Sequence, residues 1–254
     1  MTSSPWHANL ERMKEILRYE GLHFLLWRMM VKCLSPWGTL GLANFYAKDL
    51  TRPLEEAHPK VDTTITQATE GDIEQLVALV KRQHAAVENS RAVYLEDIIR
   101  CRIIDNFRRG QRCFIGKIGN QIVHYNWIFF HWMETIMGTC RFIHLKDNEA
   151  FLNDAYTLEE WRGKSIHTVV QRYMLHFLQK AGYHTAYTVV PTNNKSSMKT
   201  HHRLGWKRSG TMLYFIPLTA DEAKIWRISG VLDPFVEKDI PRNLHAGGIL
   251  DEKR

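Results

Sequence analysis

Residues 149–218 alternate between strand and helix patterns, and this order constrains the fold more than any other feature of the chain. Over 166–178, apolar residues recur at steps of three and four, as they do on one face of an α-helix. Strands are expected on either side, at 149–157 and 185–190. A polar helix over 193–204 and a last strand over 211–218 follow. Strands and helices in this order predict an α/β unit, in which helices cover a sheet.

The residues before this unit predict further strands and helices. A β-branched run at 63–66 is typical of a strand. Thr69, with Asp72 three residues later, predicts the start of an amphipathic helix. A second helix, a β-hairpin and one more strand are expected over 94–107, 113–130 and 139–145.

The two ends of the chain have different patterns. Residues 8–34 place apolar side chains on one helical stripe, and within 22–34 the opposite side is apolar too. Residues 36–60 contain three prolines and predict an irregular connection with a short helix near 42–50. The C-terminal residues predict a helical appendix with a polar tail. We therefore expect an N-terminal helical extension (1–58), an α/β domain (59–220) and a C-terminal extension (221–254).

Positive charge is concentrated in one part of the chain. The sequence has 34 Lys and Arg against 27 Asp and Glu, a net charge of +7. Residues 161–220, which we call the basic window, contain no acidic residue. A solvated surface usually mixes both signs, so this window favours an anionic ligand or partner. Its basic residues are Arg162, Lys164, Arg172, Lys180, Lys195, Lys199, Arg203, Lys207 and Arg208.

Cysteine and histidine patterns favour neither a disulfide framework nor a metal site. The four cysteines form no CxxC pair, which favours a reducing compartment. The histidines at 124, 131 and 144 form no metal signature, so no metal is expected. The N-terminus lacks the pattern of a signal peptide, and no run reaches the ~20 apolar residues of a membrane-spanning helix. We expect a cytoplasmic protein.

A basic, glycine-containing turn lies between the strand that ends at Thr157 and the helix that begins at Ile166. Its sequence is Trp161-Arg-Gly-Lys-Ser-Ile-His167. Such a turn points free backbone N–H groups and the helix dipole at one spot, where a phosphate or pyrophosphate binds. It has the spacing of neither a Walker loop nor a dinucleotide fingerprint.

In its context, this turn resembles the signature of the GNAT superfamily of acyl-CoA-dependent N-acyltransferases, Q/R-x-x-G-x-G/A after the fourth strand. Arg162 to His167 occupy the six positions of that signature. The second family segment is an Asn after the fifth strand, then a helix that ends in Leu-Gly-Phe. Here Asn194 precedes a helix that ends in Leu204-Gly-Trp206. The resemblance covers about 63–218.

The resemblance implies a mixed, mostly antiparallel α/β (α+β) central sheet that is splayed between strands four and five and flanked by helices. Acetyl-CoA, or another acyl-CoA, would lie in the gap as co-substrate. The implied function is transfer of an acetyl or other short acyl group to a primary amine of a small molecule or peptide. The implied coenzyme-binding residues are Ala155, Tyr156, Thr157, Arg162, Gly163, Lys164, Ser165, Ile166, His167, Thr168 and Asn194.

Several positions depart from the family pattern. Ser165 and His167 stand where glycines are usual, and Ser165 is a mild change provided that its φ is helical. His201 stands where many members carry a tyrosine general acid, and Val189 where some carry a glutamate base. Because the basic window has no carboxylate, our candidates are Asp154 as base, directly or through a water, and His201 as acid.

Other functions stay open at this stage. The basic window would also suit a non-catalytic GNAT-like module that binds RNA or another anionic partner, although nucleic acid is the less favoured partner. It would equally suit an acyl carrier protein as acyl donor. The apolar helix at 10–34 would dock on the sheet or on a second subunit of a homodimer, which we favour, or lie peripherally in a membrane interface. The sequence does not indicate which amine is the acceptor.

Overall fold

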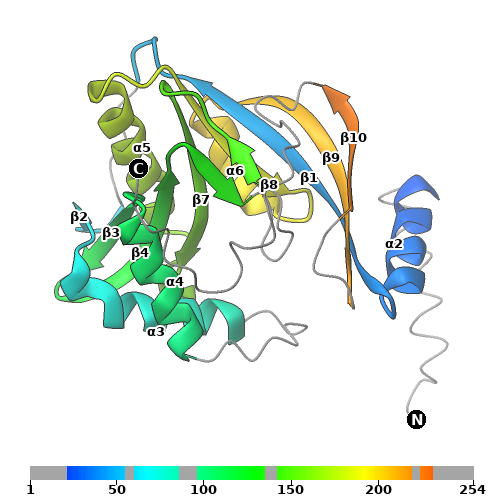
Figure 1. The fold of residues 1–254 in the computed structure, drawn as a ribbon, viewed down its shortest axis with the longest axis horizontal. Helices are drawn as coiled ribbons and strands as arrows, with labels where there is room; N and C mark the ends of the chain where they lie inside the picture. The colour runs from blue at the N-terminus through cyan, green and yellow to red at the C-terminus, as the bar shows by residue number, and fades with distance from the viewer. Residues whose placement is uncertain (1–21, 55–59, 86–95, 135–141, 219–223, 231–254) are drawn as a thin grey trace, which may run out of the picture.

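One eight-stranded sheet forms the centre of the protein (Figure 1). The computed structural model describes residues 22–54, 60–85, 96–134, 142–218 and 224–230. The strand order is β10-β9-β1-β8-β7-β4-β3-β2, and all neighbours are antiparallel except β7 and β8. The mixed, mostly antiparallel sheet is therefore confirmed. Its strands are β1 (Gly38–Asp49), β2 (Thr64–Gln67), β3 (Arg112–Ile118), β4 (Gln121–Phe129), β7 (Glu149–Thr157), β8 (Thr185–Pro191), β9 (Lys207–Pro217) and β10 (Lys224–Gly230).

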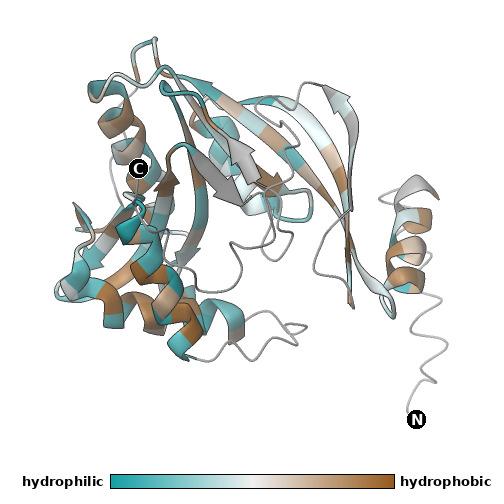
Figure 2. Ribbon diagram, viewed as in Figure 1, coloured by the Kyte–Doolittle hydropathy of each residue, from teal (hydrophilic) through white to brown (hydrophobic). Residues whose placement is uncertain are grey.

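Helices cover both faces of the sheet, and hydrophobic residues recur along them (Figure 2). On one face, the Phe107 ring lies 5.1 Å from that of Trp127 on β4. On the other, the Phe177 ring lies 5.2 Å from that of Phe114 on β3. Phe114 pairs with Asn126, the neighbour of Trp127, and successive strand residues face opposite sides. The first face carries α3 (Ile73–Ala85) and α4 (Glu96–Arg108), and the second carries α5 (Ile166–Lys180) and α6 (Lys195–Arg203).

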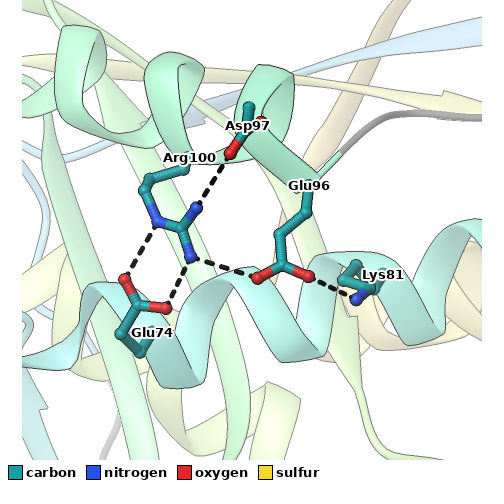
Figure 3. Close-up of polar contacts among 5 residues, drawn as sticks. All are labelled: Glu74, Lys81, Glu96, Asp97 and Arg100. Carbon is teal, nitrogen blue, oxygen red and sulfur yellow. Dashed lines mark hydrogen bonds and ion pairs between the residues drawn. The ribbon is translucent and has the colours of Figure 1, made fainter.

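A polar network joins α3 to α4 (Figure 3). Arg100 of α4 binds Glu74 of α3 through Nε at 3.0 Å and Nη2 at 2.8 Å. The same guanidinium also contacts Glu96 and Asp97 of its own helix. Lys81 of α3 completes the network by donating to Glu96 at 2.6 Å. These contacts fix the position of α3 relative to α4 on the first face of the sheet.

The elements expected between residues 63 and 218 are confirmed, with ends that differ by a few residues. The capping box before α3 is present, since the Thr69 amide donates to Asp72 Oδ2 at 2.9 Å. The strand expected at 139–145 is confirmed in part: β6 (Phe142–His144) pairs with β5 (Trp132–Glu134) in a separate two-stranded sheet.

The expected short helix near 42–50 is wrong. Gly38–Asp49 form β1, which pairs with β8 on one side and β9 on the other. Phe45 and Tyr46 at its centre are fully buried. Residues 38–49 therefore belong to the same sheet as the α/β domain, instead of to a separate helical extension.

The C-terminal expectation also needs correction, because Lys224–Gly230 form the edge strand β10 where a helical appendix was expected. At the N-terminus, α2 (Leu22–Leu34) is the described part of the expected helix. Residues 1–21 and 231–254 lie outside the described residues. None of the described helices combines the length and apolar character that a membrane crossing requires.

Candidate active site

β7 and β8 diverge and leave a gap in the sheet. They pair only at their beginnings, from Glu149 with Thr185 to Phe151 with Tyr187. Farther along, β7 still pairs with β4 and β8 with β1, but the edges that face each other have no strand partner. Such unpaired N–H and C=O groups bind an extended ligand as an added strand. The gap confirms the splay, and residues 155–157 lie on its β7 side.

A β-bulge interrupts β7 beside this gap. The pairing with β4 passes from Asn153 directly to Tyr156, so Asp154 and Ala155 together lie opposite one residue of β4. Asp154 has a left-handed φ of 54°. For a residue other than glycine this backbone costs about 1–3 kcal/mol, and such strain is concentrated at functional sites.

The bulge directs the Asp154 carboxylate to the face that carries α3 and α4. Oδ1 accepts from the Tyr125 hydroxyl at 3.1 Å and contacts Nε2 of Gln83 at 3.5 Å. The hydroxyl is also bonded to Oε1 of Gln83. Burial and the Asp154 charge raise the pKa of Tyr125 well above its usual value, so the phenol stays a donor. All described contacts of Asp154 engage Oδ1, which leaves Oδ2 for a ligand.

The turn before α5 has the backbone of an anion site. Gly163 and Ser165 have left-handed φ values of 77° and 65°. Left-handed residues next to a helix start turn successive N–H groups toward one concave spot, which attracts phosphate. The amides of residues 166–168 begin α5 and have no partner within the helix. Ser165 thus adopts the backbone that the family glycine allows, so the condition of a helical φ, under which the change from glycine would be mild, is not met.

Two cations lie where β7 meets this turn. Arg162 Nε donates to the Thr157 carbonyl oxygen at 3.2 Å, and its guanidinium pairs with Glu159 at 3.3 Å. Nζ of Lys164 lies 4.0 Å from the ring centroid of Trp161. Both positive charges are therefore held at the turn, beside the open end of the gap.

His201 is buried between the sheet and α5, with 2% of its surface exposed. Its Nδ1 lies 2.7 Å from the Ser197 carbonyl oxygen, and its Nε2 lies 3.1 Å from Nε2 of Gln171. Nδ1 must carry the proton because a carbonyl only accepts, and Nε2 then accepts from the amide. Burial lowers the pKa of His201 to about 4. A neutral ring with both nitrogens engaged does not suit the expected acid role.

His201 is the last of three histidines in a row. The ring of His167 lies 5.2 Å from that of His124 and 6.2 Å from that of His201. Burial, and then the neighbouring His201, lower the pKa of His167 to about 3. His167 therefore contributes a neutral ring to the row of three histidines and a backbone amide to the turn.

The residues present fit a polar co-substrate such as acetyl-CoA. On the α5 side of β4, Nε2 of His124 and the side-chain amide of Asn126 are buried with no hydrogen-bond partner among the described residues. Asn194 caps α6, with Oδ1 accepting from the Ser197 amide at 3.0 Å, so its own N–H groups are left to donate to a ligand. The gap, the turn and Asn194 thus offer hydrogen-bond donors to the pantetheine and pyrophosphate groups.

An open pocket of about 280 Å³ lies between the end of α3 and the end of β7. An ion pair of 3.4 Å joins Arg82 of α3 to Glu160 across it. Because α3 forms one wall, the pocket opens on the face to which Asp154 points. Its lining residues are Arg82, Ala85, Tyr156, Leu158, Glu159 and Glu160. In the described ranges, no group of three or more His, Cys, Asp or Glu residues could hold a metal ion.

Residues 105–206 match the model of the Acetyltransferase (GNAT) family. Over this segment the chain is similar to the GNAT acetyltransferases. GNAT acetyltransferases take the acyl group from acetyl-CoA, and the matched segment includes the gap, the turn and Asn194. A comparison with curated protein sequences gives no match.

Solved structures resemble this chain at low identity. A functionally unknown conserved protein from Staphylococcus epidermidis has a TM-score of 0.51 at 12% identity; the match covers 72% of this chain and 63% of that protein. An N-acetyltransferase from Staphylococcus aureus has a TM-score of 0.48 at 16% identity, over 65% and 95% of the two chains. A predicted acetyltransferase with acetyl-CoA from Clostridium acetobutylicum has a TM-score of 0.46 at 15% identity, over 58% and 92%.

Sequence reasoning missed the side chains that surround Asp154. Tyr125 and Gln83 bind its carboxylate, and Asp154 opposes the lowering of the His84 pKa that burial causes. These residues are far from Asp154 in sequence and belong to no motif. Only the pairing of β4 with β7 and the packing of α3 bring them together.

Proposed function

We propose that this protein is a GNAT acetyltransferase that transfers an acetyl group from acetyl-CoA to a primary amine of a small molecule, and that the amine binds beside Asp154. The observation that carries the proposal is the position of that carboxylate. Asp154 lies in the bulge at the edge of the gap and faces α3, whereas the turn and α5 lie on the opposite face. Donor and acceptor would thus approach the gap from opposite sides of the sheet.

In this proposal Asp154 accepts a proton from the bound ammonium, directly or through a water, so that the free amine attacks the thioester carbon. The carbon–sulfur bond then breaks, and the departing thiolate takes up a proton to give free coenzyme A. Tyr125 and Gln83 hold Oδ1 and leave Oδ2 toward the acceptor. The left-handed φ of Asp154 supports this role, because a strained backbone of this kind is concentrated at functional sites.

The pocket beside α3 supports a cationic amine as acceptor. Glu159 and Glu160 contribute two carboxylates to its wall, where they pair with Arg162 and Arg82, so a substrate ammonium would compete with these guanidinium groups. A substrate with more than one amino group would place one nitrogen near Asp154 and another between these carboxylates. Charge–charge attraction would hold such a substrate more tightly than a monoamine of the same length.

The test is a comparison of Asp154→Asn with Asp105→Asn, a control at an exposed carboxylate that pairs only with Arg109 of its own helix among the described residues. Turnover of acetyl-CoA would be measured against monoamines and diamines. We expect Asp154→Asn to lower kcat by about 10²–10⁴-fold with little change in acetyl-CoA affinity, and Asp105→Asn to match the wild type. Wild-type turnover in Asp154→Asn would refute the role of this carboxylate.

An acyl carrier protein is the second candidate donor, because α6 presents a basic face. Lys195, Lys199 and Arg203 recur every four residues, are exposed, and form no ion pair with the described residues. An acidic carrier would fit this face while its phosphopantetheine arm entered the gap. Faster transfer from acetyl-carrier protein than from acetyl-CoA, lost in Lys199→Glu, would favour the carrier.

A further inference from the structure

One short helix joins the pocket beside α3 to the turn before α5. The 3₁₀ helix η2 (Glu159–Trp161) follows the end of β7. Its two acidic residues, Glu159 and Glu160, line the pocket. Arg162 comes directly after η2, and the turn proposed for the coenzyme pyrophosphate begins with the next residue, Gly163. Residues 159–162 therefore adjoin both the acceptor pocket and the co-substrate turn.

The side chain of Arg162 faces the pocket. Its guanidinium carbon lies 5.6 Å from the ring centroid of Tyr156, which is one of the lining residues. Nη1 pairs with Oε1 of Glu159 at 3.3 Å, and Nε donates to the Thr157 carbonyl oxygen at 3.2 Å. The charge of Arg162 is thus held at the pocket, although its backbone leads into the phosphate turn.

Both carboxylates of the pocket are engaged by guanidinium groups of the protein itself. Arg162 pairs with Glu159, and Arg82 of α3 pairs with Glu160 at 3.4 Å. A substrate ammonium that binds to either carboxylate must displace an arginine. The pocket therefore accepts a cation more readily once one of these ion pairs has opened.

The pair between Arg162 and Glu159 is of a kind that opens easily. The two side chains are 52% and 65% exposed, and ion pairs at such exposure contribute little because water competes for both partners. A pyrophosphate carries more negative charge than one carboxylate and accepts paired hydrogen bonds from a guanidinium. Bound at the turn that follows Arg162, it would be the stronger of the two partners.

Arg82 has no such alternative partner. It lies on α3, across the pocket from η2, and belongs to no part of the phosphate turn. A coenzyme bound at that turn would therefore open the pair of Glu159 and leave the pair of Glu160 closed.

We propose that Arg162 exchanges the Glu159 carboxylate for the coenzyme pyrophosphate, so that bound acetyl-CoA makes Glu159 available to an ammonium group of the acceptor. This inference rests on the proposed function, in which the pocket holds the acceptor. Arg162 acts through Glu159 and is a positioning residue. Because coupling between two ligands is reciprocal, a diamine should strengthen coenzyme binding by the same factor by which the coenzyme strengthens binding of the diamine.

The first test requires no amine. Titration calorimetry measures the affinity for coenzyme A of the wild type, Glu159→Gln, Arg162→Gln and the double variant, which form a double-mutant cycle. Glu160→Gln, alone and combined with Arg162→Gln, is the matched control, because it removes the same charge from the adjacent residue, whose partner is Arg82. Circular dichroism shows that each variant is folded.

We expect Glu159→Gln to bind coenzyme A about threefold more tightly than Glu160→Gln, because only Glu159 competes with the pyrophosphate for Arg162. In the Arg162→Gln background the two substitutions should have equal effects. Equal effects with Arg162 present, or the same gain from Glu159→Gln without Arg162, would overturn the exchange.

The second test measures the coupling to the acceptor. Putrescine, a diamine, is titrated into the protein with and without saturating coenzyme A, whose free thiol has no acetyl group to transfer. We expect coenzyme A to tighten putrescine binding about threefold in the wild type, and to change it little in Arg162→Gln, in which Glu159 is available in both cases. Arg109→Gln, which opens an ion pair on α4 at an arginine that is also 52% exposed, should behave as the wild type.

The two tests separate this inference from the proposed function. Equal tightening of putrescine binding in the wild type and in Arg162→Gln would overturn the coupling. If the cycle gives the expected result but putrescine does not bind, the exchange of Arg162 is supported and the diamine acceptor is wrong. If putrescine is acetylated with the expected dependence on Asp154 but the cycle is additive, the proposed function is supported and the exchange is wrong.

Discussion

The surroundings of His201 and of Asp154 are built by residues that are far away in the sequence. His201 stands at a position that the motif spacing marks, whereas Asp154 is the carboxylate of the strand before the basic window and lies in the bulge at the gap. Its hydrogen bonds could not be predicted, because Gln83 belongs to a distant helix. The burial of His201 could not be predicted either. It depends on Gln171 of α5 and on Tyr46 of β1, whose ring lies 5.6 Å away.

Because burial lowers the pKa of His201 to about 4, the protein should lose stability in mild acid. Between pH 6.5 and pH 4 the unfolded chain protonates this histidine and the folded chain does not, so stability falls as pH falls through that window. From pH 7 to pH 5 the loss from this group is about 2 kcal/mol. In His201→Gln the side chain at this position cannot be protonated. The free energy of unfolding of this variant should therefore fall by about 2 kcal/mol less than that of the wild type between pH 7 and pH 5.

Urea unfolding at both pH values measures this difference. His202→Gln changes the exposed neighbour on α6 and serves as the control, with a pH dependence expected to follow that of the wild type. If His201→Gln loses as much stability as the wild type between the two pH values, His201 does not remain neutral in the folded protein.

At the scale of elements, the helices and strands whose apolar residues recur with a helix or strand period could be predicted from the sequence. β1 could not be predicted. Both faces of β1 are largely buried, so its residues lack the alternation that marks a half-exposed strand. Its glycines also lower its strand propensity, yet they are required here. A Cβ on Gly41 would overlap the Tyr214 ring of β9, and one on Gly38 would overlap the Ile216 carbonyl oxygen.

The start of α5 can be tested as an anion site with two variants of Gly163. The space around this residue is open, so a Cβ at Gly163 meets no atom within 4 Å. Gly163→Ala introduces only the strain of a left-handed φ, whereas Gly163→Asp adds a negative charge beside the proposed pyrophosphate position. We expect Gly163→Asp to bind acetyl-CoA at least tenfold more weakly than Gly163→Ala, or ~1.4 kcal/mol.

Titration calorimetry gives both affinities, and circular dichroism shows that both variants are folded. Equal affinities would mean that the coenzyme phosphates do not lie at this turn.

At the scale of the whole molecule, β1 moves the beginning of the α/β domain from residue 59 to residue 38, because it lies inside the central sheet. A chain that begins near residue 59 lacks the strand between β8 and β9, so each of these strands would lose its backbone partner on that side, and the core would lose the buried side chains of β1. We expect this shortened chain to be insoluble or to unfold without a cooperative transition. A chain that begins at residue 36 lacks α2 but keeps β1, and should fold.

Thermal unfolding followed by circular dichroism distinguishes the two shortened chains. A cooperative transition near the wild-type midpoint in the chain that begins near residue 59 would show that β1 is dispensable.

The central position of β1 also has a consequence during synthesis. Gly38 pairs with Pro217 and Asp49 with Thr185, so the first described strand to leave the ribosome pairs with strands that are made more than a hundred residues later. At about 5–20 residues per second, β1 waits on the order of ten seconds or more for these partners. Throughout that time Phe45 and Tyr46, fully buried in the finished sheet, are exposed to the cell. The nascent chain should therefore be a substrate for chaperones that hold apolar segments until translation ends.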